Sequence, residues 1–582
     1  MVDLAGGIGP RERRASTVVA SLARWPSAPL GRRTTALLAG LLAALIALSF
    51  WLYEGILENV VFTAAVTITL GGLIAVLTRR VLFAAVLIAA MVVIVNGVAT
   101  AKVNTMGMVL HAYDIVFYLG SWSTITYLWF ATPGYVAAFV GAMTLLLVLG
   151  VVAWRADGLN VRRMPVAIVT ALALVTASYT GLTKPDRRHT QFYWNALYVS
   201  SFYASWAETL ETLWRGHIVE SARASNAPPF IPATRCDLDR KPPHIVLVHQ
   251  ESVVQPSLFP TLDYDRNLDK LFKSTDGRLH KLRVETYGGA SWLTEFSILT
   301  GLSTHSFGGM RPFVQSLLAG KVRDTLPETL ARCGYRNVLF YPMLRNFVSN
   351  ARFYDAIGLK EIFDLKAQKA KSEQERDRFY YSNALDEMER HVKTSHKPLF
   401  TYIQTMSVHW PYNWAFEPHV KVAGGGPGTD PEMSEYLRRV AMAKMDYDYL
   451  IAELKRRFPG EQIIVMHYGD HHPTATQKLL GHDPETQVED LKLDPKSAAF
   501  ITYYAVDRIN MPMRPLPDFD VVDVPYLGVI LLDQAGLPMS EANRERVRLL
   551  HSCHGHYHGC ARRTEILSFH RRLIDSNIIT SR

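Results

Sequence analysis

The sequence predicts two parts of different fold class: an α-helical transmembrane domain of about five spans, then an α/β domain with a mostly parallel central sheet. The chain has 582 residues and a hydrophobic fraction of 49%, but its long apolar runs all lie before residue 183. From about residue 240, short β-branched runs alternate with amphipathic stretches. Alternation of this kind is typical of a parallel sheet flanked by helices.

Five apolar runs approach the roughly 20 residues that a helix needs to cross a bilayer. They cover residues 34–53, 60–78, 81–100, 133–153 and 164–182. We do not expect the first run to be a cleaved signal peptide, because its basic leader is long, no small-residue cleavage site follows, and further spans come after it. Residues 104–132 are apolar but contain His111, Asp114 and Gly120, so we expect an interfacial or partly re-entrant helix there.

The basic residues of the short loops predict the orientation of these spans. The segments "RERR" and "GRR" precede the first span, "TRR" follows the second, and "WRADGLNVRR" separates the fourth from the fifth. The loop "YEGILEN" after the first span has no Lys or Arg, and the loop after the third has only Lys102. We therefore expect a cytoplasmic N-terminus and an outer C-terminal domain, although "KPDRRH" after the last span points weakly the other way. Because the net charge of +9 owes much to these inner loops, no nucleic-acid partner is expected.

These features divide the chain into four segments. Residues 1–33 form a basic cytoplasmic N-terminus, 34–182 the transmembrane domain, 183–240 an interfacial helix and linker, and 241–582 the outer α/β domain. The helix is expected at residues 191–214, where eight aromatic residues suit the headgroup layer of the outer leaflet. A helix packed under the outer domain is the alternative.

All four cysteines lie after the last predicted span, at Cys236, Cys333, Cys553 and Cys560. An even count in an oxidising compartment permits disulfides. The last two enclose the histidines of "HSCHGHYHGC", where we favour a small disulfide loop or a flexible tail over a zinc site, because the spacing matches no common finger pattern. For Cys333, in the helix-like "LARCGYRN", a buried free thiol is nearly as well supported.

Six runs from residue 244 onward predict strands, and one long stretch predicts a helix. The strand runs are "HIVLVHQ", "KLRVETY", "RNVLFYP", "PLFTYIQT", "EQIIVMHYG" and "AAFITYYAV". The helical stretch "DPEMSEYLRRVAMAKMDYDYLIAELKRRFPG" begins with acidic residues and Pro431 and ends at basic residues before Pro-Gly, as helices do. Because α/β folds place their chemistry at the carboxyl ends of strands, polar residues directly after these runs are candidate site residues.

Glu251, Asp470 and His471 directly follow two of these strands. Carboxylate oxygens with one imidazole suit Zn²⁺ or Mn²⁺. Each residue alone is weak support, because a glutamate at a strand end is more often a surface or capping residue and an Asp-His pair more often belongs to a turn. Together, on separate strands of one sheet, they predict a metal site.

Two further residues have a functional and a structural interpretation. Ser291 follows the Gly-Gly turn of "YGGASWLTEFSILTGL" and opens an apolar helical pattern. The residues alone favour a helix cap; the functional alternative is a nucleophile whose developing anion the helix dipole stabilises. His409, in "SVHWPY" after another strand, either holds a phosphoryl oxygen or stacks in an aromatic corner with Trp410 and Tyr412.

The order of these pieces resembles the outer domain of the lipoteichoic acid synthase and phosphoglycerol transferase family, in the alkaline phosphatase and sulfatase superfamily. The pieces are "QES", a hydroxyl residue four positions before "EF", "SVHWPY" and "YGDH". The predicted five-span N-terminus is also similar to that family's architecture. The resemblance implies that Glu251, Asp470 and His471 are metal ligands and that Ser291 is both ligand and nucleophile, with Thr294 as the rival hydroxyl.

The resemblance also implies substrate contacts. His409 matches the family's phosphate-contacting histidine. The family's Trp-Asn-Arg headgroup segment has no tryptophan in this chain, where the region reads "RNFVSNARFYDAIGLKEIFD" and Asn350 and Arg352 are the nearest matches. On this interpretation His472 is at most a substrate contact, and His467 lies outside the metal site.

The activity that the resemblance implies is transfer of a phosphoglycerol headgroup. Phosphatidylglycerol in the membrane would be the donor and a periplasmic or cell-surface glycan the acceptor, through a covalent phospho-serine on Ser291. One Mn²⁺ or Zn²⁺ ion would be the cofactor, with Mg²⁺ also possible. The implied location is the bacterial inner (cytoplasmic) membrane with the catalytic domain in the periplasm, and no oligomeric state is implied.

Three alternatives stay open. The nearest is a phosphoethanolamine transferase of the same fold acting on a glycan or lipid A; "QES" and "YGDH" favour phosphoglycerol transfer, since many ethanolamine transferases instead resemble "GET" and "DHGE". The others are a non-catalytic membrane scaffold for glycan export and a lipid phosphodiesterase that releases its intermediate to water. Sulfatase chemistry is disfavoured, because neither Ser291 nor Cys333 begins a Cys/Ser-x-Pro-x-Arg motif.

Overall fold

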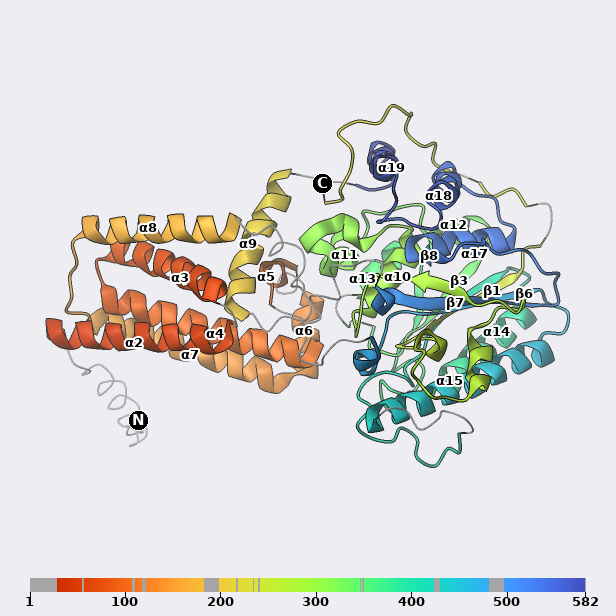
Figure 1. The fold of residues 1–582 in the computed structure, drawn as a ribbon, viewed down its shortest axis with the longest axis horizontal. Helices are drawn as coiled ribbons and strands as arrows, with labels where there is room; N and C mark the ends of the chain where they lie inside the picture. The colour runs from red at the N-terminus through yellow and green to blue at the C-terminus, as the bar shows by residue number, and fades with distance from the viewer. Residues whose placement is uncertain are drawn as a thin grey trace, which may run out of the picture. The chain divides into compact units, whose positions relative to one another are not determined.

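The chain folds into two compact units, which are described separately. The computed structural model describes residues 29–580 except 55–56, 107–109, 118–121, 183–197, 216–217, 234, 239–240, 346, 348–349, 423–429 and 481–496. Unit 1 comprises Met1–Ala112 and Leu128–Ala207, and unit 2 comprises Tyr113–Tyr127 and Glu208–Arg582. Figure 1 shows both units with the labels used below.

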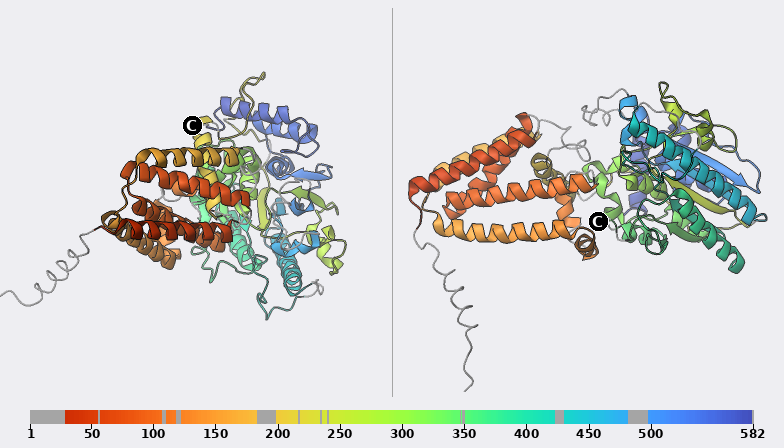
Figure 2. Two further views of the ribbon diagram at one scale, coloured as in Figure 1. Left: turned by 60° about the vertical axis from the view of Figure 1, so that its left-hand side comes forward. Right: turned by 90° about the horizontal axis from the view of Figure 1, so that it is seen from below.

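Unit 1 contains the five predicted membrane spans, which are confirmed as helices long and apolar enough to cross a bilayer. They are α2 (Arg32–Tyr53), α3 (Leu57–Thr78), α4 (Val81–Met106), α7 (Pro133–Ala156) and α8 (Arg163–Leu182). These helices run side by side (Figure 2). A Cβ at Gly72 of α3 would collide with the Thr170 hydroxyl of α8, so the missing side chain permits the close approach that is common between membrane helices.

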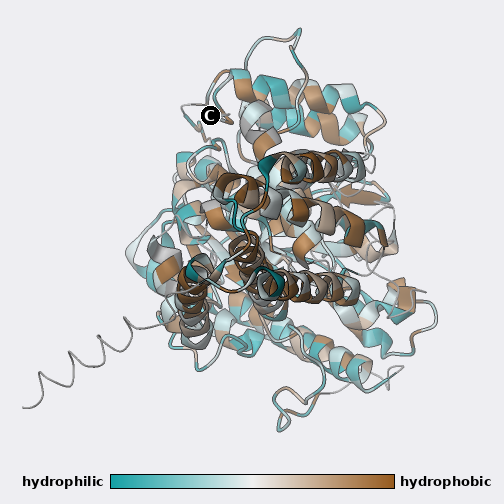
Figure 3. Cartoon of the chain, turned by 90° about the vertical axis from the view of Figure 1, so that its left-hand side faces the viewer, coloured by the Kyte–Doolittle hydropathy of each residue, from teal (hydrophilic) through white to brown (hydrophobic). Residues whose placement is uncertain are grey.

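The outer surfaces of these helices are apolar, as Figure 3 shows by hydropathy. Leu37, Leu77 and Leu172, for example, are 74%, 75% and 64% exposed. Water would disfavour so much leucine and valine surface, whereas lipid chains would not. The exposure therefore fits helices that contact lipid.

Three shorter helices lie outside the five spans in the sequence: α5 (Ala112–Phe117), α6 (Trp122–Ala131) and α9 (Tyr198–Arg215). Nearly all of α5 belongs to unit 2, and α6 and α9 are divided between the units. The first two lie within the predicted interfacial segment and are too short to span a bilayer; their membrane location stays a prediction. The Glu54 carboxylate accepts hydrogen bonds from the Val199 and Ser200 amides at the start of α9. The helix then presents Trp206, Leu210 and Trp214, spaced by four residues and 39%, 61% and 92% exposed. Contact with headgroups through this face stays a prediction, and the earlier aromatics of the predicted helix lie outside the described residues.

Unit 2 is built on one eight-stranded sheet in the order β4-β3-β5-β1-β6-β7-β2-β8. The strands are β1 (His244–Gln250), β2 (His280–Arg283), β3 (Arg336–Phe340), β4 (Glu361–Phe363), β5 (Leu399–Gln404), β6 (Ile463–Gly469), β7 (Ile501–Ile509) and β8 (Val521–Asp523). All neighbours are parallel except the two pairs that involve β7. The predicted mostly parallel sheet is confirmed, and each of the six predicted runs contains a strand. The two edge strands have three residues each, too few for an apolar pattern to reveal.

Helices cover both faces of the sheet (Figure 1). One face carries α14 (Asp377–Thr394) and α15 (Pro431–Arg457), whose apolar residues form a core with Val246 and Val248 of β1. The other face carries α10 (Ser291–Thr300), α12 (Leu326–Arg332) and α17 (Leu527–Ala535). The remaining helices of this unit from residue 314 onward are α11 (Val314–Leu318), α13 (Asn350–Ala356), α18 (Glu541–Ser552) and α19 (Arg563–Asp575).

Helix α15 confirms the predicted long helix and its boundaries. The Asp430 side chain caps it by accepting a hydrogen bond from the Met433 amide, and Pro431 occupies the first turn. Three basic residues stand in the last turn, where they complement the helix dipole.

All four cysteines are paired, as Cys236–Cys333 and Cys553–Cys560. The disulfide interpretation is confirmed for the second pair. The free-thiol alternative for Cys333 is wrong, because the chain before β1 brings Cys236 beside the end of α12. The long pair closes a loop with a sequence separation of 97, and tying down such a loop is worth about 2–5 kcal/mol in small secreted domains.

Asp377, at the start of α14, gives a prediction about pH. It is fully buried, and burial together with the negative charge of Asp446 raises the pKa of Asp377 to about 7 from an ordinary value of 3.8. The folded chain therefore keeps a proton that the unfolded chain releases. The stabilisation from this group is complete below about pH 4 and is lost as the pH rises to about 7.

Asp377→Asn still accepts the hydrogen bond from the Ser407 amide but cannot titrate. The free energy of unfolding of the variant, relative to the native chain, should rise by up to about 1.4 kcal/mol per pH unit between about pH 4 and 7 and level off above. Thermal unfolding of the detergent-solubilised chain across this range measures the difference. Asp386→Asn, on an exposed face of the same helix, should shift little, and parallel curves for Asp377→Asn and the native chain would contradict the prediction.

Candidate active site

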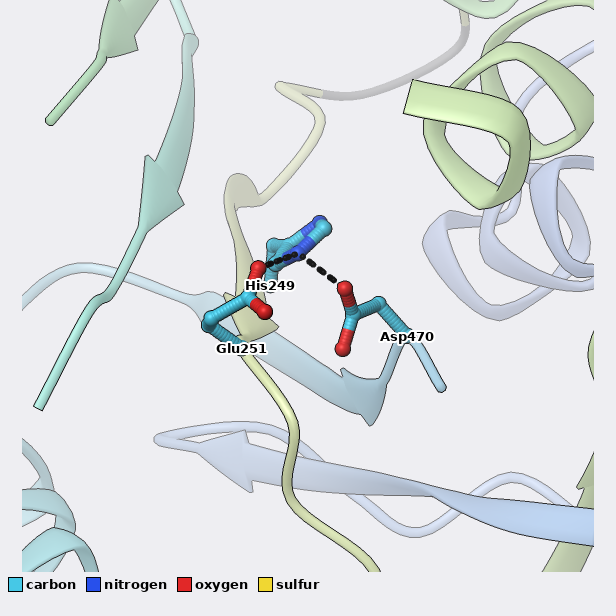
Figure 4. Close-up of side chains that lie close together, drawn as sticks. All are labelled: His249, Glu251 and Asp470. Carbon is cyan, nitrogen blue, oxygen red and sulfur yellow. Dashed lines mark ion pairs between the residues drawn. The ribbon is translucent and has the colours of Figure 1, made fainter. Parts of the chain in front are cut away.

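Polar side chains from β1 and β6 meet at the carboxyl edge of the sheet. The two strands are parallel neighbours, and Gln250 pairs with Gly469 at their ends. The next residues, Glu251 and Asp470, therefore leave the sheet side by side. Figure 4 shows their carboxylates close together, with the His249 ring between them.

Ser291 reaches this cluster from the first turn of α10. Gly288, Gly289 and Ala290 all have positive φ (67°, 152° and 63°), a backbone that bends the chain sharply before the helix. The Ser291 hydroxyl donates a hydrogen bond to Glu251 Oε2 at 2.8 Å and lies 3.3 Å from His471 Nε2. The serine is half-buried, so its oxygen is open to a substrate on one side.

His471 is oriented by its own backbone neighbour. Its Nδ1 donates to the His472 carbonyl at 2.9 Å, which leaves Nε2 pointing at the cluster. That nitrogen lies 3.2 Å from Glu251 Oε1 and 3.2 Å from Asp470 Oδ2. A histidine whose other ring nitrogen is fixed by a carbonyl is the usual arrangement in metal sites.

The two oxygens of Asp470 have different surroundings. Oδ1 accepts hydrogen bonds from the Ser252 and His471 amides at 2.8 and 2.9 Å. Oδ2 is buried and accepts no hydrogen bond from the described residues. Its nearest polar neighbours are the Nε2 atoms of His249 and His471, at 3.1 and 3.2 Å, so this oxygen stands among other possible ligand atoms and is suited to a metal ligand.

His249 belongs to the same cluster, although sequence reasoning missed it. Its Nε2 lies 3.1 Å from Asp470 Oδ2 and 3.6 Å from Glu251 Oε2, and its Nδ1 contacts the Tyr468 hydroxyl at 3.0 Å. The signal was available, because side chains two apart on a strand share a face and His249 lies two residues before Glu251. Ligand atoms of His249, Glu251 and Asp470 all lie within 4.8 Å of one another.

Two backbone features hold the strand ends together. Ser252 has a φ of 59°, unusual for a serine, and this conformation aims its amide at Asp470. At Gly469 a Cβ would collide with the Val253 carbonyl, so only glycine lets the turn after β1 approach the end of β6. Backbone strain of this kind persists where the surrounding structure enforces it, often at functional sites.

The cluster is electrostatically balanced by its imidazoles. Burial lowers the pKa of His471, but the carboxylates of Asp470 and Glu251 outweigh burial and raise it to about 9. Burial also raises the pKa of Glu251, yet the neighbouring His471 and His249 hold it well below its usual range. Two buried carboxylates thus need positive charge between them.

The donor set fits one divalent cation. Glu251, Asp470, His471 and Ser291 would hold it, and His249 is close enough to join them or to orient Asp470. Carboxylate oxygens with imidazole nitrogen suit Zn²⁺ or Mn²⁺, and the buried Asp470 Oδ2 lies beside both imidazoles.

Glu251→Gln should lower the affinity for this metal more than about tenfold, because even partners outside the direct ligands contribute 10–100-fold. The metal content of the purified full chain, measured by plasma mass spectrometry after dialysis, tests this. Glu432→Gln changes an exposed glutamate of α15 and should keep the native content. Equal metal in both variants would mean that Glu251 is not a ligand.

His409 lies in a loop after β5 that is held from behind by Arg439 of α15. The arginine is fully buried and donates to the carbonyls of His409, Pro411 and Trp414 at 2.8, 2.9 and 3.0 Å. Its Nε donates to Glu435 at 2.7 Å. His409 Nδ1 donates to its neighbour's carbonyl, so Nε2 is the nitrogen left for a substrate.

His409 also helps to lower the pKa of Glu251, against the effect of burial and by less than His471 and His249 do. The loop is therefore close to the cluster. It also exposes two aromatic side chains, Trp410 at 58% and Trp414 at 45%. The predicted aromatic corner is therefore only half-formed: Tyr412 is buried, whereas Trp410 faces solvent.

The other predicted residues lie in varied surroundings. Thr294 is buried and donates to the Asp470 carbonyl at 2.8 Å, so it braces the cluster from below. Both ring nitrogens of the buried His472 have protein partners, Thr476 and the Ile501 carbonyl. Asn350 donates to the Tyr341 hydroxyl from the start of α13, and Arg352 is exposed on the same helix. Among the described residues, neither contacts the cluster, and their substrate roles stay predictions.

Comparisons with known proteins agree with this geometry. Residues 244–495 match the sulfatase family. The chain is 22% identical over 327 residues to an uncharacterized protein of Haemophilus influenzae, a match covering 52% of this chain and 55% of that protein. The chain thus spans about half the length of that curated relative.

Three solved structures are similar to the chain. Lipoteichoic acid synthase LtaP from Listeria monocytogenes is 18% identical, with 51% of this chain and 72% of that chain covered and a TM-score of 0.41. Phosphoglycerol transferase GacH from Streptococcus pyogenes, in complex with sn-glycerol-1-phosphate, is 14% identical, with 58% of this chain and 87% of that chain covered and a TM-score of 0.45. The C-terminal periplasmic domain of EcEptC from Escherichia coli is 16% identical, with 55% of this chain and 89% of that chain covered and a TM-score of 0.37.

The site lies inside the matched region, and the match confirms the superfamily that the motifs indicated. The region that matches the sulfatase family follows five helices long and apolar enough to cross a membrane.

Proposed function

We propose that this chain is a membrane-anchored phosphotransferase that moves a phosphoglycerol headgroup from phosphatidylglycerol to a periplasmic or cell-surface glycan. The observation that carries the proposal is the position of Ser291: its hydroxyl, at a helix start, donates to Glu251 beside His471. A helix cap alone would bond to its own helix, but the Ser291 side chain makes no cap hydrogen bond and is directed at the ligand cluster. The membrane spans support a lipid donor.

The reaction proceeds in two steps, formation and breakdown of a phospho-serine. The Ser291 oxygen attacks the donor phosphorus, the bond from phosphorus to the diacylglycerol oxygen breaks, and the serine proton ends on the departing oxygen. The acceptor hydroxyl then attacks the phospho-serine, the bond to Ser291 breaks, and the acceptor proton returns to the serine oxygen. A divalent cation on Glu251, Asp470 and His471 would supply Lewis-acid stabilisation of the phosphoryl charge.

The chain's own groups complete the stabilisation of the phosphoryl oxygens. The start of α10 carries the positive end of the helix dipole beside Ser291. His409 offers Nε2 from a loop that Arg439 and Gln374 fix through the His409 carbonyl. A donor held in this way loses little entropy on contacting the substrate.

The proposed location is the bacterial inner membrane, with unit 2 in the periplasm. The basic loops of the sequence support a cytoplasmic N-terminus. The two disulfides of unit 2 support an oxidising compartment. Such a location gives the site access to lipid headgroups of the outer leaflet and to exported glycans.

The purified chain, incubated with fluorescent phosphatidylglycerol and candidate glycans, tests the proposal. Release of fluorescent diacylglycerol together with a phosphoglycerol mass increment on the glycan is expected. A preference for phosphatidylethanolamine would favour the phosphoethanolamine alternative, and free glycerol phosphate without labelled glycan would favour hydrolysis. Full complementation of a deletion strain by Ser291→Ala would point to a scaffold and refute the enzyme.

A further inference from the structure

A second concave site lies on unit 2, formed largely by the loop that the Cys553–Cys560 disulfide closes. Its volume is about 420 Å³, within the usual size range of sites for small ligands. The walls come from the end of β2 at Arg283, the end of β8 at Asp523, His305 before α11, and the disulfide loop with His556 and His558.

Hydrogen bonds and close packing hold this loop against the sheet. The Asp523 amide donates to the Gly555 carbonyl at 2.8 Å, and the Asp523 carboxylate accepts from the Tyr557 amide at 2.6 Å. A Cβ at Gly555 would collide with the Val521 carbonyl of β8, so the loop lies directly against this strand. The disulfide and these bonds fix the direction of the two loop histidines.

The acidic groups of the cavity are already satisfied by the protein. The Glu285 carboxylate accepts from the hydroxyls of Ser297, Ser303 and Thr304. The two oxygens of Asp523 accept from Arg283 and from the Tyr557 amide. No acidic oxygen of the wall therefore lacks a donor.

Several nitrogens that belong to residues of the cavity wall, in contrast, have no hydrogen-bond partner among the described residues. His305 and His558 lie with ring centroids 4.9 Å apart, and no ring nitrogen of either makes a hydrogen bond among the described residues. Buried polar atoms without a partner include His558 Nδ1 and Arg283 Nε. On the rim, Arg562 is 62% exposed and pairs with Glu565 on the surface. Since buried polar atoms rarely stay unpaired, these nitrogens favour a ligand that brings acceptor oxygens.

The charge around the two imidazoles points to an anion. Burial, and then Arg311, His558 and Arg563, hold the pKa of His305 well below its ordinary value. Besides burial, Arg311 and Arg563 thus place positive charge near His305. An oxyanion would meet arginine and imidazole donors there, the groups that recognise phosphate.

We propose that this cavity is an oxyanion subsite that binds a phosphate ester. It opens at the same edge of the sheet as Ser291, because β2 and β8 run parallel to β6. β2 is two strands from β6, so the subsite lies roughly 10 Å along that edge. This assignment rests on the proposed function: the phosphate belongs to an acceptor glycan that already carries phosphate groups. The subsite holds one of these groups while the next acceptor hydroxyl reaches the phosphoryl group on Ser291.

Binding is tested without turnover by calorimetry on the full chain in detergent, with sn-glycerol 1-phosphate as the probe. Treatment with a chelator removes any cation from Glu251 and Asp470, so that no bound metal attracts the probe to the nucleophile site. One saturable site is expected, weakened about tenfold or more in His305→Leu and His558→Leu, since a bond to a charged group is worth that much. Arg562→Gln, on the exposed rim, should weaken it as well without endangering the fold.

The control is His396→Leu, which makes the same change at an exposed histidine and should bind like the native chain. Absence of saturable binding in the native chain, or native affinity in all three cavity variants, would overturn the subsite. Native unfolding temperatures for the variants show that any loss is local.

Kinetics then identify the source of the phosphate. His558→Leu should raise KM for a phosphate-bearing acceptor at unchanged kcat and leave KM for the unsubstituted acceptor unchanged. A raised KM for phosphatidylglycerol vesicles would instead assign the subsite to the donor lipid and refute the acceptor assignment. If the native chain transfers nothing, the proposed function fails while the binding result still decides the subsite.

Discussion

Replacing Ser291 by alanine is expected to lower headgroup transfer by about a thousandfold or more, because removal of a nucleophile leaves only binding and electrostatic stabilisation. Ser291 is half-buried and follows Ala290, which is the N-cap of α10, so the loss of its side chain should cost the fold little. Diacylglycerol release from fluorescent phosphatidylglycerol measures the rate, and trapping of a phosphorylated chain before acceptor addition measures the intermediate.

Two matched variants make this result specific. Ser291→Thr keeps a hydroxyl at the same atom and should retain substantial transfer. Thr294→Ala removes the rival hydroxyl, which donates to the Asp470 carbonyl, and should slow the reaction modestly without abolishing the phosphorylated intermediate. If Thr294→Ala loses the intermediate and Ser291→Ala keeps it, the nucleophile is assigned to the wrong residue.

Arg439→Met should have the second-largest effect, because this arginine links the loop of His409 to α15. The change leaves the Pro411 and Trp414 carbonyls without the donor that Arg439 supplies. It also removes one donor from the His409 carbonyl, which keeps Gln374, and one from Glu435, which keeps Arg438. Breaking a buried ion pair by removing one partner costs about 3–5 kcal/mol, so we expect a clear fall in the unfolding temperature. Arg439→Lys keeps the charge, but one ammonium group cannot reach the same three carbonyls and Glu435 together.

A double-mutant cycle separates positioning from stability. In folded protein, Arg439→Lys and His409→Ala should each lower kcat/KM, and the double variant should lose little more than His409→Ala, because both act through one imidazole. Arg456→Lys, on an exposed part of the same helix, should leave both stability and kcat/KM unchanged. Additive losses in the cycle would mean that Arg439 stabilises the domain without positioning His409.

The sequence by itself determined the division of the chain and much of its architecture. Membrane-length apolar runs are visible locally, because each helix in lipid must satisfy its own backbone and present apolar side chains along its whole length. Six of the eight strands of the sheet were visible as well, since both faces are covered and each central strand is a short apolar run. Glu251, Asp470 and His471 could be placed at the strand ends, since parallel strands end at a common edge.

The tertiary structure alone decided which side chains share the site. His249 looked like one more buried strand residue until the register of β1 and β6 brought it to Asp470. The hydroxyl facing Glu251 was decided by the turn at residues 288–290, which directs Ser291 to the cluster and leaves Thr294 beneath Asp470. Cys236 and Cys333 stand far apart in the sequence, and only the packing of the linker beside α12 pairs them. Local patterns record burial and periodicity, whereas a site depends on register, turn geometry and long-range contacts that no short window of sequence contains.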